Sequence, residues 1–154
     1  MKDTDGLVHG GRVFRIIVAG EIFDGFRVVG FDLETTGFDV RKERIVEYAL
    51  IGSDVDGSDI NLQSLVYPEK RIPFEASNVH GIKDQDVRDS GNFSEHIGEI
   101  SKIIIDSIVV GHNIITFDWK MLEMECFRAG VETPKPRSIM YTLVIAITLK
   151  SPGM

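Results

Sequence analysis

The chain is poor in cysteine and has no long apolar run. Cys126 is the single cysteine among 154 residues, which excludes an internal disulfide and a zinc site built from several thiolates. No segment approaches the ~20 apolar residues that span a bilayer. The polar, Gly-rich start MKDTDGLVHGG lacks the apolar core of a signal peptide. We therefore expect a soluble cytoplasmic protein that makes no membrane contact, with Cys126 as buried apolar filler in a helix.

Positive charge is also scarce. The chain has 17 Lys and Arg against 24 Asp and Glu, which gives a formal net charge of -7. Proteins that bind nucleic acid through its phosphates usually carry a basic surface, so the composition by itself does not indicate such a partner. A cluster of carboxylates that holds divalent cations becomes locally positive, however. An acidic protein can therefore still bind phosphate at such a site.

Length and composition predict one compact domain. A content of 43% hydrophobic and 27% charged residues suits a chain with its own core, and no internal repeat or linker divides it. We expect an N-terminal extension over residues 1–26, with an extra strand from Arg12 to Glu21, and a main domain over residues 27–154.

Strand and helix signals alternate along the main domain. The Asp56-Gly57 pair between two β-rich runs predicts an antiparallel hairpin. Ser94 and Thr116 are the expected N-caps of two helices, and Gly130 is expected to end the second. The expected elements are strands over residues 27–34, 44–54, 59–68 and 107–113, helices over residues 94–106 and 117–129, and a short strand leading into a helix over residues 139–150. This order predicts an α/β fold with a mixed sheet and helices on its faces.

The stretch FDLETTG, residues 31–37, places two carboxylates at the end of a hydrophobic strand. Side chains alternate along a strand, so Phe31 and Leu33 face the core while Asp32 and Glu34 share the opposite face. Two like charges this close repel unless a cation lies between them, and hard Mg²⁺ or Mn²⁺ favours carboxylate oxygens. The alternative is a solvated strand end without a ligand, which the D-x-E pattern alone leaves open.

Asp118 is the third candidate metal ligand. It lies in the first turn of the expected helix over residues 117–129, shortly after the strand over residues 107–113. If that strand runs beside the Asp32 strand, the turn brings Asp118 to the same end of the sheet. An acid in a first helical turn also stabilises the helix dipole by ~0.3–1 kcal/mol without any catalytic role. Both interpretations of Asp118 follow from its position.

Four segments together resemble one nuclease family. FDLETTG, RIVEYALIG, NVHGI and VVGHNIITFDWKML are similar to the first two sequence blocks of the DEDD superfamily of 3′→5′ exonucleases, the DnaQ-like proofreading and RNA-trimming nucleases. F-D-x-E-T-T-G followed by H-N-x-x-x-F-D is a specific pattern, and the match covers residues 28–149. The resemblance implies a ribonuclease H-like fold, an α/β architecture with a five-stranded mixed sheet flanked by helices, whose second strand is antiparallel.

The resemblance also implies the chemistry and its residues. Asp32, Glu34 and Asp118 are expected to be catalytic and to hold two divalent metal ions, Mg²⁺ or Mn²⁺, of the kind that stabilises both the attacking and the leaving oxygen in phosphodiester hydrolysis. The expected substrate is a single-stranded 3′ end of DNA or RNA. Glu47 receives no ligand role, because one carboxylate in a strand is usually structural or solvated.

Four neighbouring residues are expected to hold the substrate. By resemblance, Thr35 lies near the terminal nucleotide, while Phe38, His80 and Phe117 line its base and sugar. Stacking of a base on an aromatic side chain is worth ~1–3 kcal/mol and tolerates any sequence. Phe38 and Phe117 are equally compatible with core positions, and His80 with a polar contact at a helix end.

One part of the family pattern is absent from these 154 residues. Family members carry a third block, in which a general-base His or Tyr precedes a fourth metal-binding Asp on a late helix. After Asp118 the chain contains no His, and no Asp follows Tyr141. Truncation, degeneration, or a block supplied from elsewhere would each explain this, and the fold is expected to be incomplete at its C-terminus. Because losing a general base typically costs ~10²–10⁴-fold in rate, we expect a weak or inactive nuclease.

A non-catalytic module is the alternative function. A descendant that keeps the exonuclease fold could bind nucleic acid or a polymerase-like partner through its sheet. The missing block favours this interpretation, and the presence of Asp32, Glu34 and Asp118 opposes it. An incomplete fold would also expose apolar surface, which favours a homo-oligomer.

Overall fold

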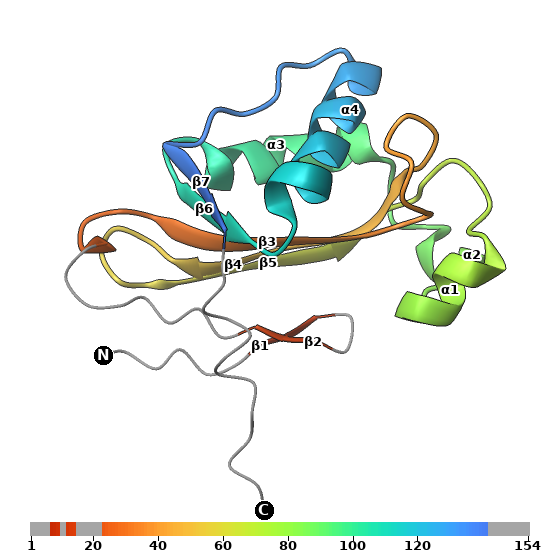
Figure 1. The fold of residues 1–154 in the computed structure, drawn as a ribbon, viewed down its shortest axis with the longest axis horizontal. Helices are drawn as coiled ribbons and strands as arrows, with labels where there is room; N and C mark the ends of the chain where they lie inside the picture. Colours follow the sequence, from red (N-terminus) through yellow and green to blue (C-terminus); the bar gives the residue numbers. More distant parts are fainter. Residues whose placement is uncertain (1–6, 10–11, 15–22, 142–154) are drawn as a thin grey trace, which may run out of the picture.

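A five-stranded mixed sheet forms the centre of the computed structural model, which describes residues 7–9, 12–14 and 23–141 (Figure 1). The strands lie in the order β5-β4-β3-β6-β7. Their bounds are β3 (Val28–Thr35), β4 (Ile45–Ser53), β5 (Asp59–Leu65), β6 (Ile108–Gly111) and β7 (Ser138–Tyr141). β4 is antiparallel to both of its neighbours, whereas β3, β6 and β7 are parallel. The prediction of a mixed sheet with an antiparallel second strand is confirmed.

The β4–β5 hairpin turns where the Asp56-Gly57 pair predicts it. Gly57 has a φ of 82°, a conformation that glycine adopts without steric cost. The Ser58 N–H donates to Asp56 Oδ1 at 2.9 Å, and the Asp54 N–H donates to the Ser58 carbonyl at 2.8 Å. Side chains of the edge strand β5 alternate between exposed and half-buried, as expected for a strand with one solvated face.

Helices α3 (Phe93–Ile104) and α4 (Trp119–Ala129) lie together over one face of the sheet (Figure 1). The N-cap of α3 is Asn92, so the prediction of Ser94 is wrong. Phe93 is buried and begins the apolar stripe of this helix, which places Ser94 inside the first turn. The Asn92 N–H donates to Glu95 Oε2 at 2.9 Å, as in a capping box.

Helix α4 follows a π-helical turn, η2 (Ile114–Asp118). The predicted N-cap Thr116 lies inside this turn, so that prediction is also wrong. The helical path begins early because Asn113 adopts a φ of 54° and its carbonyl accepts the Phe117 N–H at 2.9 Å. Gly130, with a φ of 70°, ends α4 as predicted.

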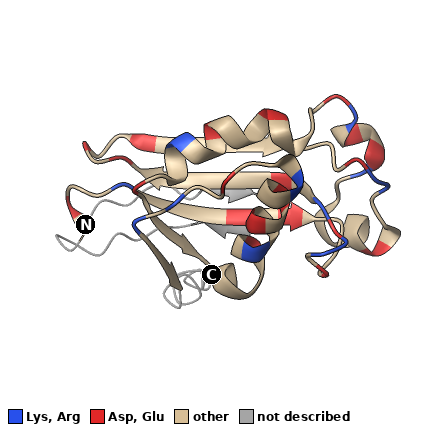
Figure 2. Cartoon of the chain, turned by 90° about the horizontal axis from the view of Figure 1, so that it is seen from above, with Lys and Arg blue, Asp and Glu red and all other residues tan. Residues whose placement is uncertain are grey.

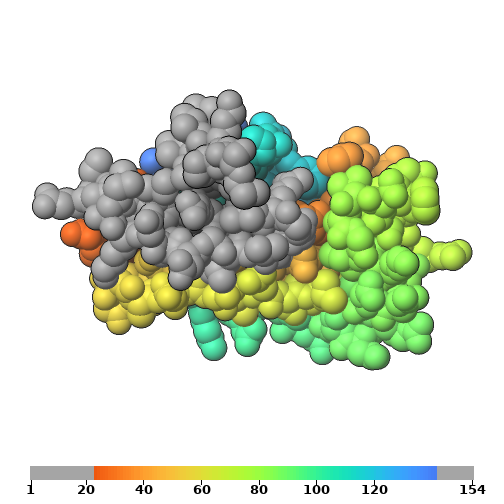
Figure 3. Space-filling view, turned by 90° about the horizontal axis from the view of Figure 1, so that it is seen from below, coloured from red at the N-terminus to blue at the C-terminus, as the bar shows by residue number. Residues whose placement is uncertain are grey.

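Two short helices, α1 (Phe74–His80) and α2 (Asp84–Val87), lie at one end of the sheet, apart from α3 and α4 (Figure 1). Seen from below, they form the green projection beside the yellow strands (Figure 3). Their contact with the sheet is small: Val87 packs with Val46, Ile72 and Ile82. In the described part of the chain, no helix is long and apolar enough to cross a bilayer.

The N-terminal extension contains a separate two-stranded sheet. Strands β1 (Leu7–His9) and β2 (Arg12–Phe14) pair antiparallel and do not join the main sheet. The expected strand from Arg12 to Glu21 thus begins where predicted, while residues 15–22 lie outside the described residues. The short strand expected near residue 139 is β7, and the helix expected after it also lies outside the described residues.

The main core lies between the sheet and the two long helices. It includes Phe31 and Leu33 of β3, Ile100 of α3, and Leu122 and Cys126 of α4. Cys126 is completely buried, and burial raises the pKa of its thiol to about 11. A thiol of this kind is unreactive near neutral pH, so the prediction of apolar filler is confirmed.

Gly52 lies where β4 passes close to β3. A Cβ atom at this residue would lie 1.9 Å from the Val28 backbone oxygen. We expect Gly52→Ala to lower the free energy of unfolding by about 1–3 kcal/mol, as overpacking does. In the matched control Gly98→Ala, the added Cβ meets no atom within 4 Å, and the helix should gain up to about 1 kcal/mol. Urea unfolding of both variants checks this prediction, and equal midpoints would contradict it.

Candidate active site

Asp32 and Glu34 lie near the C-terminal end of β3, on the face opposite α3 and α4. Their neighbours Phe31 and Leu33 belong to the main core, and the Phe31 ring meets the Trp119 ring of α4 edge to face, with centroids 6.4 Å apart. Since side chains alternate along a strand, the two carboxylates point to the other face. Asp32 is 8% exposed and Glu34 9%, which argues against a merely solvated strand end.

Asp118 reaches the same edge of the sheet from a different strand. β6 runs parallel beside β3, so the C-terminal ends of both strands lie at one edge. Asp118 is the last residue of η2, directly before α4, and is 4% exposed. A buried carboxylate requires compensation by hydrogen bonds, a proton or a cation. An acid that only interacts with the dipole at a solvated helix end requires no such compensation.

Glu47 is a further acidic residue at this edge, to which the sequence alone assigns no ligand role. The β3–β4 register places it directly opposite Glu34, so the two side chains share one face of the sheet. Burial raises the pKa of Glu47. The alternation of β4 is visible in the sequence, but the pairing with Glu34 depends on the strand register.

The donor chemistry of the three predicted ligands fits a hard divalent cation. Asp32, Glu34 and Asp118 offer carboxylate oxygens, which Mg²⁺ and Mn²⁺ prefer. Within the described ranges, no three His, Cys, Asp or Glu side chains are grouped closely enough to hold a metal ion as they stand. The three carboxylates therefore form no closed ligand cage as they stand.

His80 joins the end of α1 to the end of β3. Its Nδ1 accepts the Ile82 N–H at 3.1 Å, so Nε2 carries the proton and donates to the Thr35 carbonyl at 3.1 Å. Burial lowers the pKa of His80, which favours this neutral form. The Thr35 hydroxyl donates to the Gly37 carbonyl at 2.7 Å. Because both ring nitrogens are engaged, His80 orders the backbone at Thr35, as a polar contact at a helix end does.

Phe38 and Phe117 come together next to the acidic edge. Their ring centroids lie 5.9 Å apart with an interplanar angle of 59°. Phe38 is 87% exposed, which excludes the core interpretation for this residue, whereas Phe117 packs partly against the main core. An exposed ring held beside a second ring is suited to stacking on a nucleic-acid base.

Charges of both signs are interspersed over the described chain (Figure 2). In this view the Lys and Arg positions are scattered among Asp and Glu positions along the described ribbon. The whole chain carries a net charge of -7, and a group of carboxylates that holds divalent cations is one arrangement that makes an acidic protein locally positive.

The chain is similar to an exonuclease family model and to epsilon subunits of DNA polymerase III. The exonuclease family model RNase_T matches residues 29–151. The DNA polymerase III subunit epsilon of Treponema pallidum is 30% identical over 95 residues, covering 62% of this chain and 44% of that protein. The subunit epsilon of Aquifex aeolicus is 36% identical over 93 residues, covering 59% of this chain and 45% of that protein. The chain thus spans less than half the length of these curated relatives.

Solved structures support the same fold. E. coli exonuclease I in complex with a dT13 oligonucleotide aligns with a TM-score of 0.61 and 20% sequence identity, over 69% of this chain and 24% of that one. Similarity at this level of identity concerns the fold. The predicted ribonuclease H-like fold is therefore confirmed. The family model and the epsilon subunits confirm the resemblance to DnaQ-like exonucleases.

Proposed function

Because the chain belongs to the RNase_T exonuclease family and is of the DnaQ-like type, we propose that it is a metal-dependent 3′→5′ exonuclease that hydrolyses phosphodiester bonds at a single-stranded 3′ end of DNA or RNA. The observation that carries this proposal is the burial of Asp32, Glu34 and Asp118 at one edge of the sheet. A scaffold with no chemistry to perform gains nothing from burying three acids there, since burial of a carboxylate is costly.

The residues of the site would have three separate roles: binding metal ions, stacking on the base and positioning the backbone. Asp32, Glu34 and Asp118 would hold two Mg²⁺ or Mn²⁺ ions, which when bound supply a nucleophilic hydroxide and neutralise charge on the phosphate. Phe38 and Phe117 would stack on the terminal base without regard to its identity. His80 would keep the backbone at Thr35 in place.

We further propose that the chain trims slowly. The 154 residues contain no His and no Asp after Asp118. Among the upstream histidines, His96 is engaged by the Tyr48 hydroxyl at 2.9 Å and the Ser90 carbonyl at 2.6 Å, and both nitrogens of His80 are also engaged. Neither of these two imidazoles has a nitrogen left to act as a general base. Loss of the general base that the third sequence block carries typically costs ~10²–10⁴-fold in rate.

Degradation of end-labelled single-stranded DNA and RNA tests this proposal. With Mg²⁺ or Mn²⁺, we expect slow shortening from the 3′ end, at a rate ~10²–10⁴-fold below that of the Treponema pallidum epsilon subunit measured in parallel. Asp32→Ala should abolish the shortening. Equal rates in wild type and Asp32→Ala would contradict the exonuclease proposal, and a wild-type rate equal to that of the reference enzyme would contradict the proposed weakness.

The second candidate function is a non-catalytic nucleic-acid or protein-binding module, which is supported by the lack of His and Asp between residues 119 and 154. A folded wild-type protein that retains oligonucleotide but never shortens it would support this alternative. Since the relatives are subunits of DNA polymerase III by name, a polymerase or another replication protein in the cytoplasm is the partner we propose for either function.

A further inference from the structure

Residues 36–44 form the loop between β3 and β4, and this loop carries Phe38. Its base is closed by two hydrogen bonds: the Thr36 N–H donates to the Arg44 carbonyl at 2.9 Å, and the Arg44 N–H donates to Thr36 Oγ1 at 2.9 Å. Phe38 itself is largely exposed. The position of its ring opposite Phe117 therefore depends on how the rest of the loop is held.

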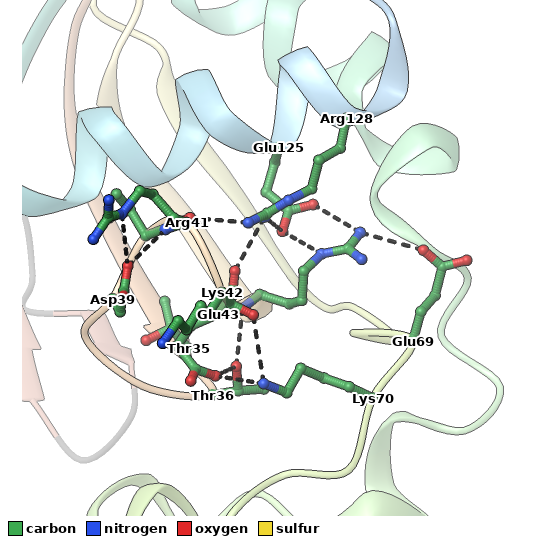
Figure 4. A network of polar contacts seen from close by, with 12 residues as sticks. Thr35, Thr36, Asp39, Arg41, Lys42, Glu43, Glu69, Lys70, Glu125 and Arg128 are labelled. Carbon is green, nitrogen blue, oxygen red and sulfur yellow. Dashed lines mark hydrogen bonds and ion pairs between the residues drawn. The ribbon is translucent and has the colours of Figure 1, made fainter.

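A buried carboxylate of α4 is the centre of a polar network at this loop (Figure 4). Glu125 is 1% exposed. Its Oε1 accepts Arg44 Nε at 2.7 Å, and its Oε2 accepts Arg44 Nη2 at 3.2 Å. Arg128 Nη1 donates to Oε1 at 3.0 Å. A buried carboxylate is tolerated when such bidentate, charge-assisted bonds satisfy both oxygens.

Arg128 extends the contact from the helix to the loop backbone. Its Nη2 donates to the Val40 carbonyl at 2.9 Å, and its Nη1 donates to the Glu43 carbonyl at 3.0 Å. One planar guanidinium thus binds Glu125 and two carbonyls of the loop. The rigid fork of Arg suits this geometry, which a lysine ammonium could not reproduce.

Residues 69 and 70 hold the loop from a second side. Lys70 Nζ lies 2.8 Å from Glu43 Oε2, which also accepts the Thr36 hydroxyl at 2.5 Å. Glu69 Oε2 lies 3.2 Å from Arg44 Nη2. The loop is therefore held at its base, from α4 and from the segment before α1.

From this geometry we infer that Glu125 and Arg128 are positioning residues, which hold the loop over residues 36–44 so that Phe38 faces Phe117 and receives the terminal base. Phe117 lies in η2, directly before α4. The same helical segment thus supplies one ring of the aromatic pair at its start and holds the other ring through Glu125 and Arg128 near its end. The substrate part of this inference rests on the proposed exonuclease function, whereas the anchoring of the loop does not.

Arg128→Met tests the anchoring without any substrate. The substitution keeps an apolar stem and removes the donors to Val40, Glu43 and Glu125. Amide hydrogen exchange at Thr36 and Glu43 should become at least ~10-fold faster, while exchange in β3 stays unchanged. Lys135→Met, which removes one positive charge from an exposed residue, is the matched control. Unchanged exchange in the loop of Arg128→Met would overturn the anchoring.

Oligonucleotide affinity tests the substrate role. For a fluorescein-labelled oligo-dT, measured by anisotropy, Arg128→Met and Phe38→Ala should each raise Kd by roughly 5- to 100-fold, the range of one base–aromatic stack. The rise in Kd of the double variant should be no larger than that of the single variant that binds less tightly, because both substitutions act through the same contact. Lys135→Met should change Kd by less than about twofold.

The outcomes separate the two proposals. Faster loop exchange with an unchanged Kd, or losses that multiply in the double variant, would overturn the positioning role. A wild-type protein that binds no oligonucleotide would overturn the proposed function and the substrate role together, while the exchange comparison would still decide whether the loop is anchored. If Arg128→Met does not fold, Arg128→Lys replaces it, with the same direction expected for exchange and Kd.

Discussion

Mg²⁺ should raise the thermal midpoint of the wild-type protein, and Asp32→Asn should abolish that rise. A ligand that binds only the folded state stabilises it by about 2.7 kcal/mol at 100 times its Kd. For a chain of this size, 1 kcal/mol corresponds to about 2–4 °C, so the expected rise is roughly 5–10 °C. Asn preserves the volume of Asp32 but removes its negative charge and replaces one carboxylate oxygen by an NH2 group, which cannot coordinate a cation. Differential scanning calorimetry with and without Mg²⁺ measures both midpoints.

Asp106→Asn is the matched control for this experiment. Asp106 is exposed, lies before β6 at the opposite edge of the sheet, and has a φ of 61°, a conformation that Asn tolerates well. Asp106→Asn should show the same rise of the thermal midpoint with Mg²⁺ as the wild-type protein. A wild-type midpoint that neither Mg²⁺ nor Mn²⁺ changes would favour the non-catalytic module over the exonuclease.

Glu125→Gln should destabilise the protein strongly, whether or not it is an enzyme. The substitution is nearly isosteric, but it removes the negative charge that Arg44 and Arg128 share. Breaking a buried ion pair on one side typically costs about 3–5 kcal/mol, because the remaining charges are left without compensation. We expect the free energy of unfolding to fall by about 3 kcal/mol, at the lower end of this range, because both arginines keep other partners.

Glu123→Gln on the same helix provides the control. Because Glu123 is exposed, the free energy of unfolding of Glu123→Gln should differ from that of the wild type by less than about 0.5 kcal/mol. Urea unfolding of the two variants at equal pH gives the comparison. If both variants unfold at the wild-type midpoint, the Glu125 network contributes little to stability, and the anchoring of the loop would need another cause.

Local patterns were sufficient for the strands and for the ends of some elements. The hydrophobic run around Phe31 predicts the central strand, the Asp56-Gly57 pair predicts the hairpin, and Gly130 predicts the end of α4. Each signal is contained in a few adjacent residues, since turn and cap conformations depend on local backbone freedom. Helix starts were less predictable: Asn92 and not Ser94 caps α3, because burial of Phe93 decides which turn comes first.

The candidate site shows the same division between local and distant information. Strand alternation is enough to place Asp32 and Glu34 on one face, because the period of a strand is a property of the backbone. The family pattern is enough to add Asp118. Neither predicts that Glu47 lies opposite Glu34, since a shift of one residue in the register would turn Glu47 to the other face.

Contacts between distant segments depended on the folded chain. Arg44 and Glu125 are 81 residues apart in the sequence, and Phe38 meets Phe117 across a similar separation. No local signal marks such pairs, because they form when α4 packs on the sheet beside the loop between β3 and β4. The residue types at the acidic edge could thus be inferred from strand period and motif, whereas the aromatic pair and the carboxylate that anchors its loop follow from helix-to-sheet packing.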